Sequence, residues 1–116
     1  MVPKSEWKER VRSLNDQMRA RGPESSEASR WVMTPGLVAL GAENVGAVIG
    51  QVRTFSDFTR DNDPYGEHDF GSVEVAGQRV FWKIDYYDRG LVDGSSDPAD
   101  ETVTCRVLTI MLAMEY

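Results

Sequence analysis

The chain has 116 residues, a net charge of -6 and 41% hydrophobic residues, so its composition is that of an ordinary soluble domain with a single core. No apolar run approaches the ~18 residues that a membrane-spanning helix needs, and the one cysteine, Cys105, excludes an internal disulfide. The N-terminal residues lack the apolar stretch of a signal peptide. We therefore expect one cytoplasmic domain over residues 1–116.

The first expected element is a helix over residues 5–20, within an N-terminal segment that ends at residue 21. Trp7, Val11, Leu14 and Met18 repeat at helical spacing, and Gly22-Pro23 ends the pattern. Residues 22–29 have the composition of a flexible linker. The remaining residues, 30–116, are expected to form an α+β core.

Residues 30–34 are predicted to form a short strand that Pro35-Gly36 ends, and residues 42–55 a second helix with apolar residues at helical spacing. Residues 69–88 alternate between apolar and polar side chains on both sides of Gly77-Gln78, which is typical of a β-hairpin. A two-residue turn there places Val75 opposite Val80 and His68 opposite Tyr87. The alternation predicts that one face of this hairpin meets the core.

The last segment, residues 102–114, is apolar on both alternate rows, which favours a strand that is buried on both faces. A helix is the competing interpretation, because Val103, Val107, Ile110 and Met114 also fit helical spacing. The predicted fold class is α+β: an antiparallel sheet of three to four strands with two helices packed on one face, in the order α-β-α-β-β-β. The final strand could also lie at the seam of a homodimer.

The charge is unevenly distributed along the chain. Residues 1–30 carry a net charge of +2, whereas residues 31–116 carry -8. Such an acidic body repels phosphate backbones, so we expect no direct binding of nucleic acid. Because the two ends of a hairpin meet, the acidic loops before and after it, residues 57–69 and 85–101, are predicted to form one negative pole.

This pole suggests three kinds of function. The first is a non-enzymatic module that binds a basic partner protein, with no cofactor and no membrane contact. The second is a small metal-assisted hydrolase, with His68 as the base and Glu67, Asp69 and Asp85 as ligands of Mg²⁺ or Mn²⁺. A mimic of DNA is a third interpretation, although a net charge of -6 is small for it. The predicted binding residues are Tyr65, Glu67, His68, Asp69, Lys83, Asp85 and Tyr87.

Several motifs resemble one bacterial family. DNDPYGEHDFG at residues 61–71, FWKIDYYD at 81–88, SSDPAD at 95–100 and the C-terminal TCRVLTIMLAMEY are similar to the family called domain of unknown function 3768. The resemblance covers most of the chain after Arg30, and it assigns no role to individual residues. Its members are largely proteobacterial and often lie on plasmids or other mobile elements. This implies a cytoplasmic accessory role, such as inhibition of a host defence or nucleic-acid-handling protein.

Overall fold

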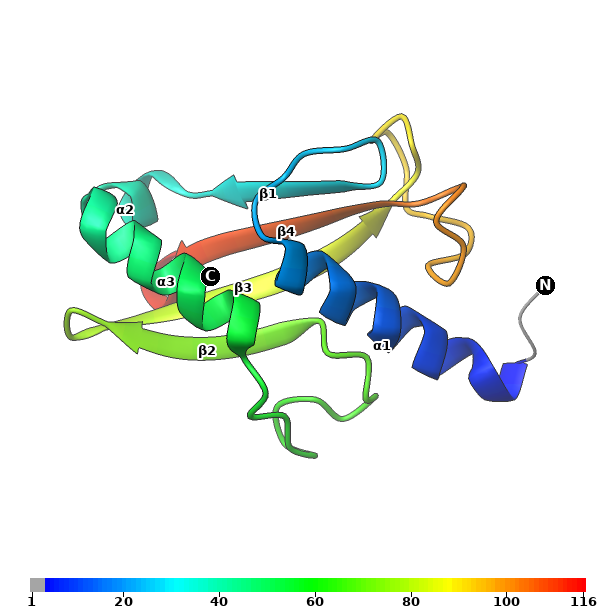
Figure 1. Cartoon of the computed structure of the whole chain (residues 1–116), viewed down its shortest axis with the longest axis horizontal. Helices are drawn as coiled ribbons and strands as arrows, with labels where there is room; N and C mark the ends of the chain where they lie inside the picture. The colour runs from blue at the N-terminus through cyan, green and yellow to red at the C-terminus, as the bar shows by residue number, and fades with distance from the viewer. Residues whose placement is uncertain (1–3) are drawn as a thin grey trace.

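The computed structural model describes the backbone of residues 4–116 and the side chains from Glu6 onward (Figure 1). The elements follow the order α1 (Lys4–Arg21), β1 (Ser29–Met33), α2 (Pro35–Val38), α3 (Ala42–Thr54), β2 (Phe70–Val75), β3 (Gln78–Tyr87), β4 (Cys105–Leu112) and the 3-10 turn η1 (Ala113–Glu115). The α+β class and each predicted helix and strand are confirmed. The short helix α2 was not predicted; it begins after Thr34, whose hydroxyl accepts a hydrogen bond from the Leu37 N–H.

The four strands form one sheet in the order β1-β4-β3-β2. The prediction of an antiparallel sheet is wrong for one pair, because β1 runs parallel to β4 whereas the other two pairs are antiparallel. The reason is the helical connection between β1 and β2. Helices α2 and α3 bring the chain back to the end of the sheet where β1 began, so β2 starts in the same direction as β1 (Figure 1). The sheet is therefore mixed.

Helices α1 and α3 cover one face of the sheet (Figure 1). Their buried residues Met18, Val48 and Val52 join the strand residues that face them in one hydrophobic core. Trp82 lies at its centre and is 0% exposed. Each helix also supplies an arginine to the carboxyl end of the other. Arg19 donates to the carbonyls of Val52 and Phe55, and Arg53 donates to the carbonyl of Ala20. These bonds supply donors to carbonyls at helix ends, where the helical hydrogen bonds run out.

The hairpin forms as predicted, but its turn lies one residue earlier. Ala76 and Gly77 occupy the two turn positions with φ of 52° and 75°, as a type I′ turn requires. The predicted pairing of Val75 with Val80 is therefore wrong: Val80 faces Val73, and Val75 faces Gln78. Since the pairing moves by two residues along one strand, each side chain keeps its face. The predicted core face is buried, with Trp82 and Ile84 among its members.

The final segment is a strand and not a helix. Strand β4 lies between β1 and β3, so both of its backbone edges are paired within the chain. Leu108 and Ile110 are buried toward the helices, and Cys105 and Met111 are buried on the other side. Val107 and Thr109 on that second side are only half-buried. No helix of the described part of the chain is both long and apolar enough to cross a membrane.

Candidate functional site

The seven residues predicted to form a site are divided between the two sides of the sheet. Lys83, Asp85 and Tyr87 alternate along β3 with residues that face the core, so they lie on the side opposite α1 and α3. Glu67, His68 and Asp69 instead contact residues on the helix side. Tyr65 is separate from both groups, at 71% exposure in the loop between α3 and β2.

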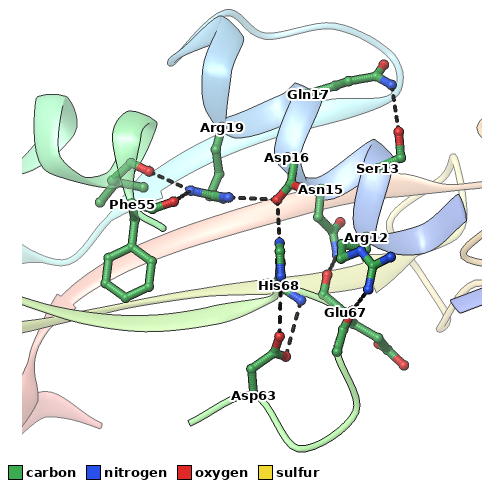
Figure 2. Close-up of polar contacts among 12 residues, drawn as sticks. Arg12, Ser13, Asn15, Asp16, Gln17, Arg19, Phe55, Asp63, Glu67 and His68 are labelled. Atoms are coloured by element: carbon green, nitrogen blue, oxygen red, sulfur yellow. Dashed lines mark hydrogen bonds and ion pairs between the residues drawn. The ribbon is translucent and has the colours of Figure 1, made fainter. Parts of the chain in front are cut away.

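His68 does not lie opposite Tyr87, as the sequence predicted. Its φ of 56° turns the backbone just before β2, and the imidazole lies under α1 instead (Figure 2). There its Nδ1 is 2.9 Å from Oδ1 of Asp16, and its ring stacks on Phe58 with 3.7 Å between the ring centroids. His68 thus joins the loop to the first helix. Register arithmetic cannot detect this, because it assumes that the extended backbone continues past the end of the strand.

Both ring nitrogens of His68 face carboxylates. Nε2 lies 3.6 Å from Oδ2 of Asp63, whose side chain is only 6% exposed, on the opposite side of the ring from Asp16 (Figure 2). The Asp16 carboxylate is itself bound by Arg19 at 2.7 Å. A general base must offer a free nitrogen to its substrate. The contacts of His68 instead suit a side chain that fixes the loop to α1.

A shallow cavity of about 280 Å³ lies beside His68. It is open to solvent, and the aromatic rings of Phe55 and Phe58 contribute to its wall. The lining residues are Asp16, Arg19, Arg53, Thr54, Phe55, Ser56, Phe58 and His68. The two arginines already donate to the helix carbonyls described above, so the charged groups of this cavity are largely engaged within the fold.

Glu67 and Asp69 belong to a polar network beneath α1. The Tyr86 hydroxyl lies 3.1 Å from Oδ2 of Asp69 and 3.5 Å from Oε2 of Glu67, and it accepts a hydrogen bond from the side chain of Asn15 at 2.8 Å. Burial raises the pKa of both carboxyl groups, and it raises the pKa of Tyr86 as well. The ionised carboxylates are therefore a cost to the folded state.

The raised pKa of Asp69 makes the stability of the fold depend on pH. Because its pKa in the folded state lies above the ordinary 3.8, the charged form is disfavoured by folding. The stabilising contribution of Asp69 is fully present below pH 3.8 and is lost as the pH rises through the folded-state value. We expect Asp69→Asn to raise the free energy of unfolding at pH 7, with a gain that shrinks as the solution is acidified. Urea denaturation across this pH range measures it.

Asp100→Asn is the matched control, because Thr102 holds the pKa of this exposed carboxyl below its usual value through hydrogen bonds. For Asp100 the sign is reversed: its contribution is present above pH 3.8 and is lost as the pH falls. A loss of stability in Asp69→Asn that is equal at all pH values would contradict the account of Asp69.

The predicted metal ligands do not converge. Asp85 lies on the opposite side of the sheet from Glu67 and Asp69, where its Oδ2 pairs with Lys83 at 3.0 Å. Within the described residues, no group of three or more histidine, cysteine, aspartate or glutamate side chains is arranged to hold a metal ion. The four residues proposed from the sequence therefore form no common centre.

The first acidic loop enters the hairpin and the second leaves it at the same end, and α1 lies between the two loops (Figure 1). The side chain of Trp7 donates to Asp97 in the second loop, and that of Asn15 donates to the Glu67 carbonyl in the first. Several carboxylates stabilise turns of their own loops: Asp88 accepts from the Val92 N–H and Asp100 from the Thr102 N–H. These two carboxylates thus serve local structure, and each loop is bound to a different part of α1.

The side of the sheet away from α1 and α3 carries the other predicted residues, and we call it the open face. Cross-strand register places Val32, Thr109, Lys83 and Phe70 in one row, with Arg30, Val107 and Asp85 in the next. The open face comprises Arg30, Val32, Phe70, Ser72, Glu74, Arg79, Phe81, Lys83, Asp85, Tyr87, Cys105, Val107, Thr109, Met111 and Tyr116.

An aromatic cluster lies on the open face. The ring centroids of Phe70 and Phe81 are 5.3 Å apart, and Tyr116 packs edge-on against both, at 6.1 Å and 5.7 Å. Phe70 and Phe81 are half-buried, and Tyr116 is 75% exposed. None of these three aromatic residues is among the seven predicted binding residues. A turn at Gly77-Gln78 would place Phe70 opposite Asp85, whereas the observed register places Phe70 opposite Lys83, and its ring lies beside that of Phe81.

Two residues that organise the helix side were also missed. Asn15 is 0% exposed and Arg19 is 4% exposed, although both are polar and belong to a helix with many charged residues. Both fall beside the predicted apolar stripe of Leu14 and Met18, which is the one signal in the sequence that they face inward.

Comparison with known proteins identifies a family. A family model described as "Protein of unknown function (DUF3768)" matches residues 33–115. No curated protein and no solved structure matches the chain. Helix α1 precedes the matched range, yet its Asn15 and Asp16 contact Tyr86 and His68 inside it. Since the match covers well over half of the 116 residues, the chain belongs to the DUF3768 family.

Proposed function

We propose that this protein is a non-enzymatic binding module whose open face docks a basic partner protein. The observation that carries the proposal is the half-buried Phe70–Phe81 pair of the aromatic cluster, on a sheet face that neither α1 nor α3 covers. Partly exposed aromatic side chains that are surrounded by polar groups are typical anchors of protein interfaces. Three of the predicted binding residues, Lys83, Asp85 and Tyr87, lie on this same face.

The net charge of the whole chain, and not the charge of the open face, favours a basic partner. On the open face Lys83 pairs with Asp85 at 3.0 Å, and at the hairpin end Arg79 pairs with Glu74 at 3.2 Å, so the charges nearest the cluster are balanced. The chain as a whole carries -6. The negative electrostatic field of the chain steers a basic partner toward the molecule. The aromatic cluster then supplies the apolar contact within the complex.

The hydrolase alternative has less support, because both ring nitrogens of His68 face carboxylates and Asp85 lies on the other side of the sheet. The accessory role implied by the family resemblance is part of the present proposal: a module encoded on a mobile element would act in the cytoplasm on a protein of its host. A binding module of this kind needs no metal or cofactor.

The test begins with a partner captured from a lysate of the source organism, which is then purified and titrated against variants. Phe81→Ala should weaken binding by about tenfold or more, because it removes the central ring of the anchor. Tyr65→Ala is the matched control, since it deletes an aromatic ring that is 71% exposed in an acidic loop. It should change the dissociation constant by less than about twofold.

Circular dichroism melting of each variant separates lost binding from lost folding. Raised ionic strength should slow association with the partner, because it screens the field of the acidic chain. Binding that survives Phe81→Ala but is lost in Tyr65→Ala would reject the open face and return the interface to the acidic loop.

A further inference from the structure

The aromatic cluster is partly covered by a residue of the chain itself. Tyr116 lies edge-on over both Phe70 and Phe81 while it remains 75% exposed. Its ring therefore buries little of its own surface, although it occupies space beside the two half-buried phenylalanines. A ring held in this way can leave at low cost, because most of its surface is already in water.

The residue before it holds the segment in place. The Glu115 carboxylate accepts hydrogen bonds from the Thr34 hydroxyl at 2.7 Å, the Leu112 N–H at 2.8 Å and the Gly36 N–H at 3.2 Å. These bonds fix the end of β4 to the start of α2. The backbone at residue 115 is thus anchored by charge-assisted hydrogen bonds, whereas the next side chain is held through ring contacts alone.

We propose that Tyr116 is a displaceable cover of the Phe70–Phe81 pair and regulates access of the partner to the open face, an inference that rests on the proposed function. The edge-on contacts of Tyr116 are ones that an aromatic or methyl group of a partner can reproduce. Because Glu115 keeps the ring close to the cluster, the effective concentration of the cover is high and it competes with every incoming side chain. Removal of the Tyr116 ring therefore exposes Phe70 and Phe81 and leaves the hydrogen bonds of Glu115 intact.

The test uses the dye 8-anilinonaphthalene-1-sulfonate, which fluoresces when it binds exposed apolar surface, on the full chain. Tyr116→Ala should raise the affinity for the dye by about threefold or more, as expected when the contacts of one aromatic ring are removed. Met114→Ala is the matched control, since this side chain is 81% exposed in the same segment. It should leave dye binding unchanged.

A second substitution localises the dye. Phe81→Ala in the Tyr116→Ala background should return dye binding to the wild-type level or below. Urea denaturation verifies that each variant is folded, because dye also binds partly unfolded chains. Dye affinity in Tyr116→Ala that equals or falls below wild type overturns the inference. So does an equal rise in Met114→Ala, or a rise that persists without Phe81.

The dye experiment tests the cover and the partner titration tests the docking face, so each can give a negative result without the other. If Tyr116→Ala raises dye binding but Phe81→Ala leaves the partner affinity unchanged, the cover exists and the proposed docking face is wrong. If Phe81→Ala abolishes partner binding but Tyr116→Ala does not raise dye binding, the docking face stands and the cover is rejected.

Discussion

Replacement of Gly71 by alanine should lower the free energy of unfolding by about 2–3 kcal/mol. Gly71 in β2 is the cross-strand partner of Trp82 in β3, and the indole occupies the space that a side chain at position 71 would need. A β-carbon at this position would be 2.3 Å from Nε1 of Trp82 and 2.6 Å from Cε2, well inside van der Waals contact. Since Trp82 is 0% exposed at the centre of the core, the indole has no free space into which it can move.

Urea denaturation measures this effect, and Gly46→Ala is the matched control. A β-carbon at Gly46 would meet no atom within 4 Å, so alanine there should stabilise α3 by about 1 kcal/mol through its higher helix propensity. The two glycine-to-alanine changes thus have opposite expected signs. A neutral or stabilising Gly71→Ala would mean that the indole does not lie against this strand.

Replacement of Asn15 by leucine should lower the free energy of unfolding by about 2–4 kcal/mol, because it leaves a buried donor of a charged side chain without its acceptor. The Asn15 amide is 0% exposed and links three groups. Its Oδ1 accepts from Nε of Arg106 at 2.8 Å, and its Nδ2 donates to the Tyr86 hydroxyl and to the Glu67 carbonyl. Leucine has a similar volume and supplies none of these bonds.

The effect on Arg106 dominates, because its side chain is 3% exposed and burial already lowers its pKa. After the substitution the guanidinium keeps its bond to the Pro98 carbonyl and its position over the Tyr86 ring, but its Nε is left without an acceptor. Gln17→Leu is the control, since this exposed amide of the same helix bonds Ser13 one turn away (Figure 2). If Asn15→Leu lowers the free energy of unfolding by no more than Gln17→Leu does, the proposed role of the Asn15 hydrogen bonds is wrong.

The hairpin shows what alternation can and cannot predict. The choice of face was correct for Val80, Trp82 and Ile84, because burial depends only on parity along the strand. The register was wrong by two residues, since it depends on which pair forms the turn. The prediction placed Gly77 at the first turn position, because glycine adopts positive φ readily. In the structure Ala76 takes that first position with a positive φ, which alanine disfavours, and Gly77 takes the second.

The candidate site was predicted less well than the fold, because side chains far apart in the sequence decide it. Asp16 and Asn15 belong to a helix that local patterns place only as an amphipathic element, yet they bind His68 and Tyr86, 52 and 71 residues later. The direction of β1 relative to β4 was also hidden, because it depends on the return path through α2 and α3.

We propose two separate roles for the predicted site residues: Lys83, Asp85 and Tyr87 would contact the partner on the open face, whereas His68 holds the loop to α1. The most direct test compares partner affinity and unfolding free energy in two variants. Combined replacement of Lys83, Asp85 and Tyr87 by alanine should abolish partner binding with little loss of stability. His68→Asn should lower stability, because it breaks the contacts with Asp16 and Phe58, and it should leave the affinity of the folded protein unchanged. Loss of binding in folded His68→Asn, with binding intact in the triple variant, would contradict the claim.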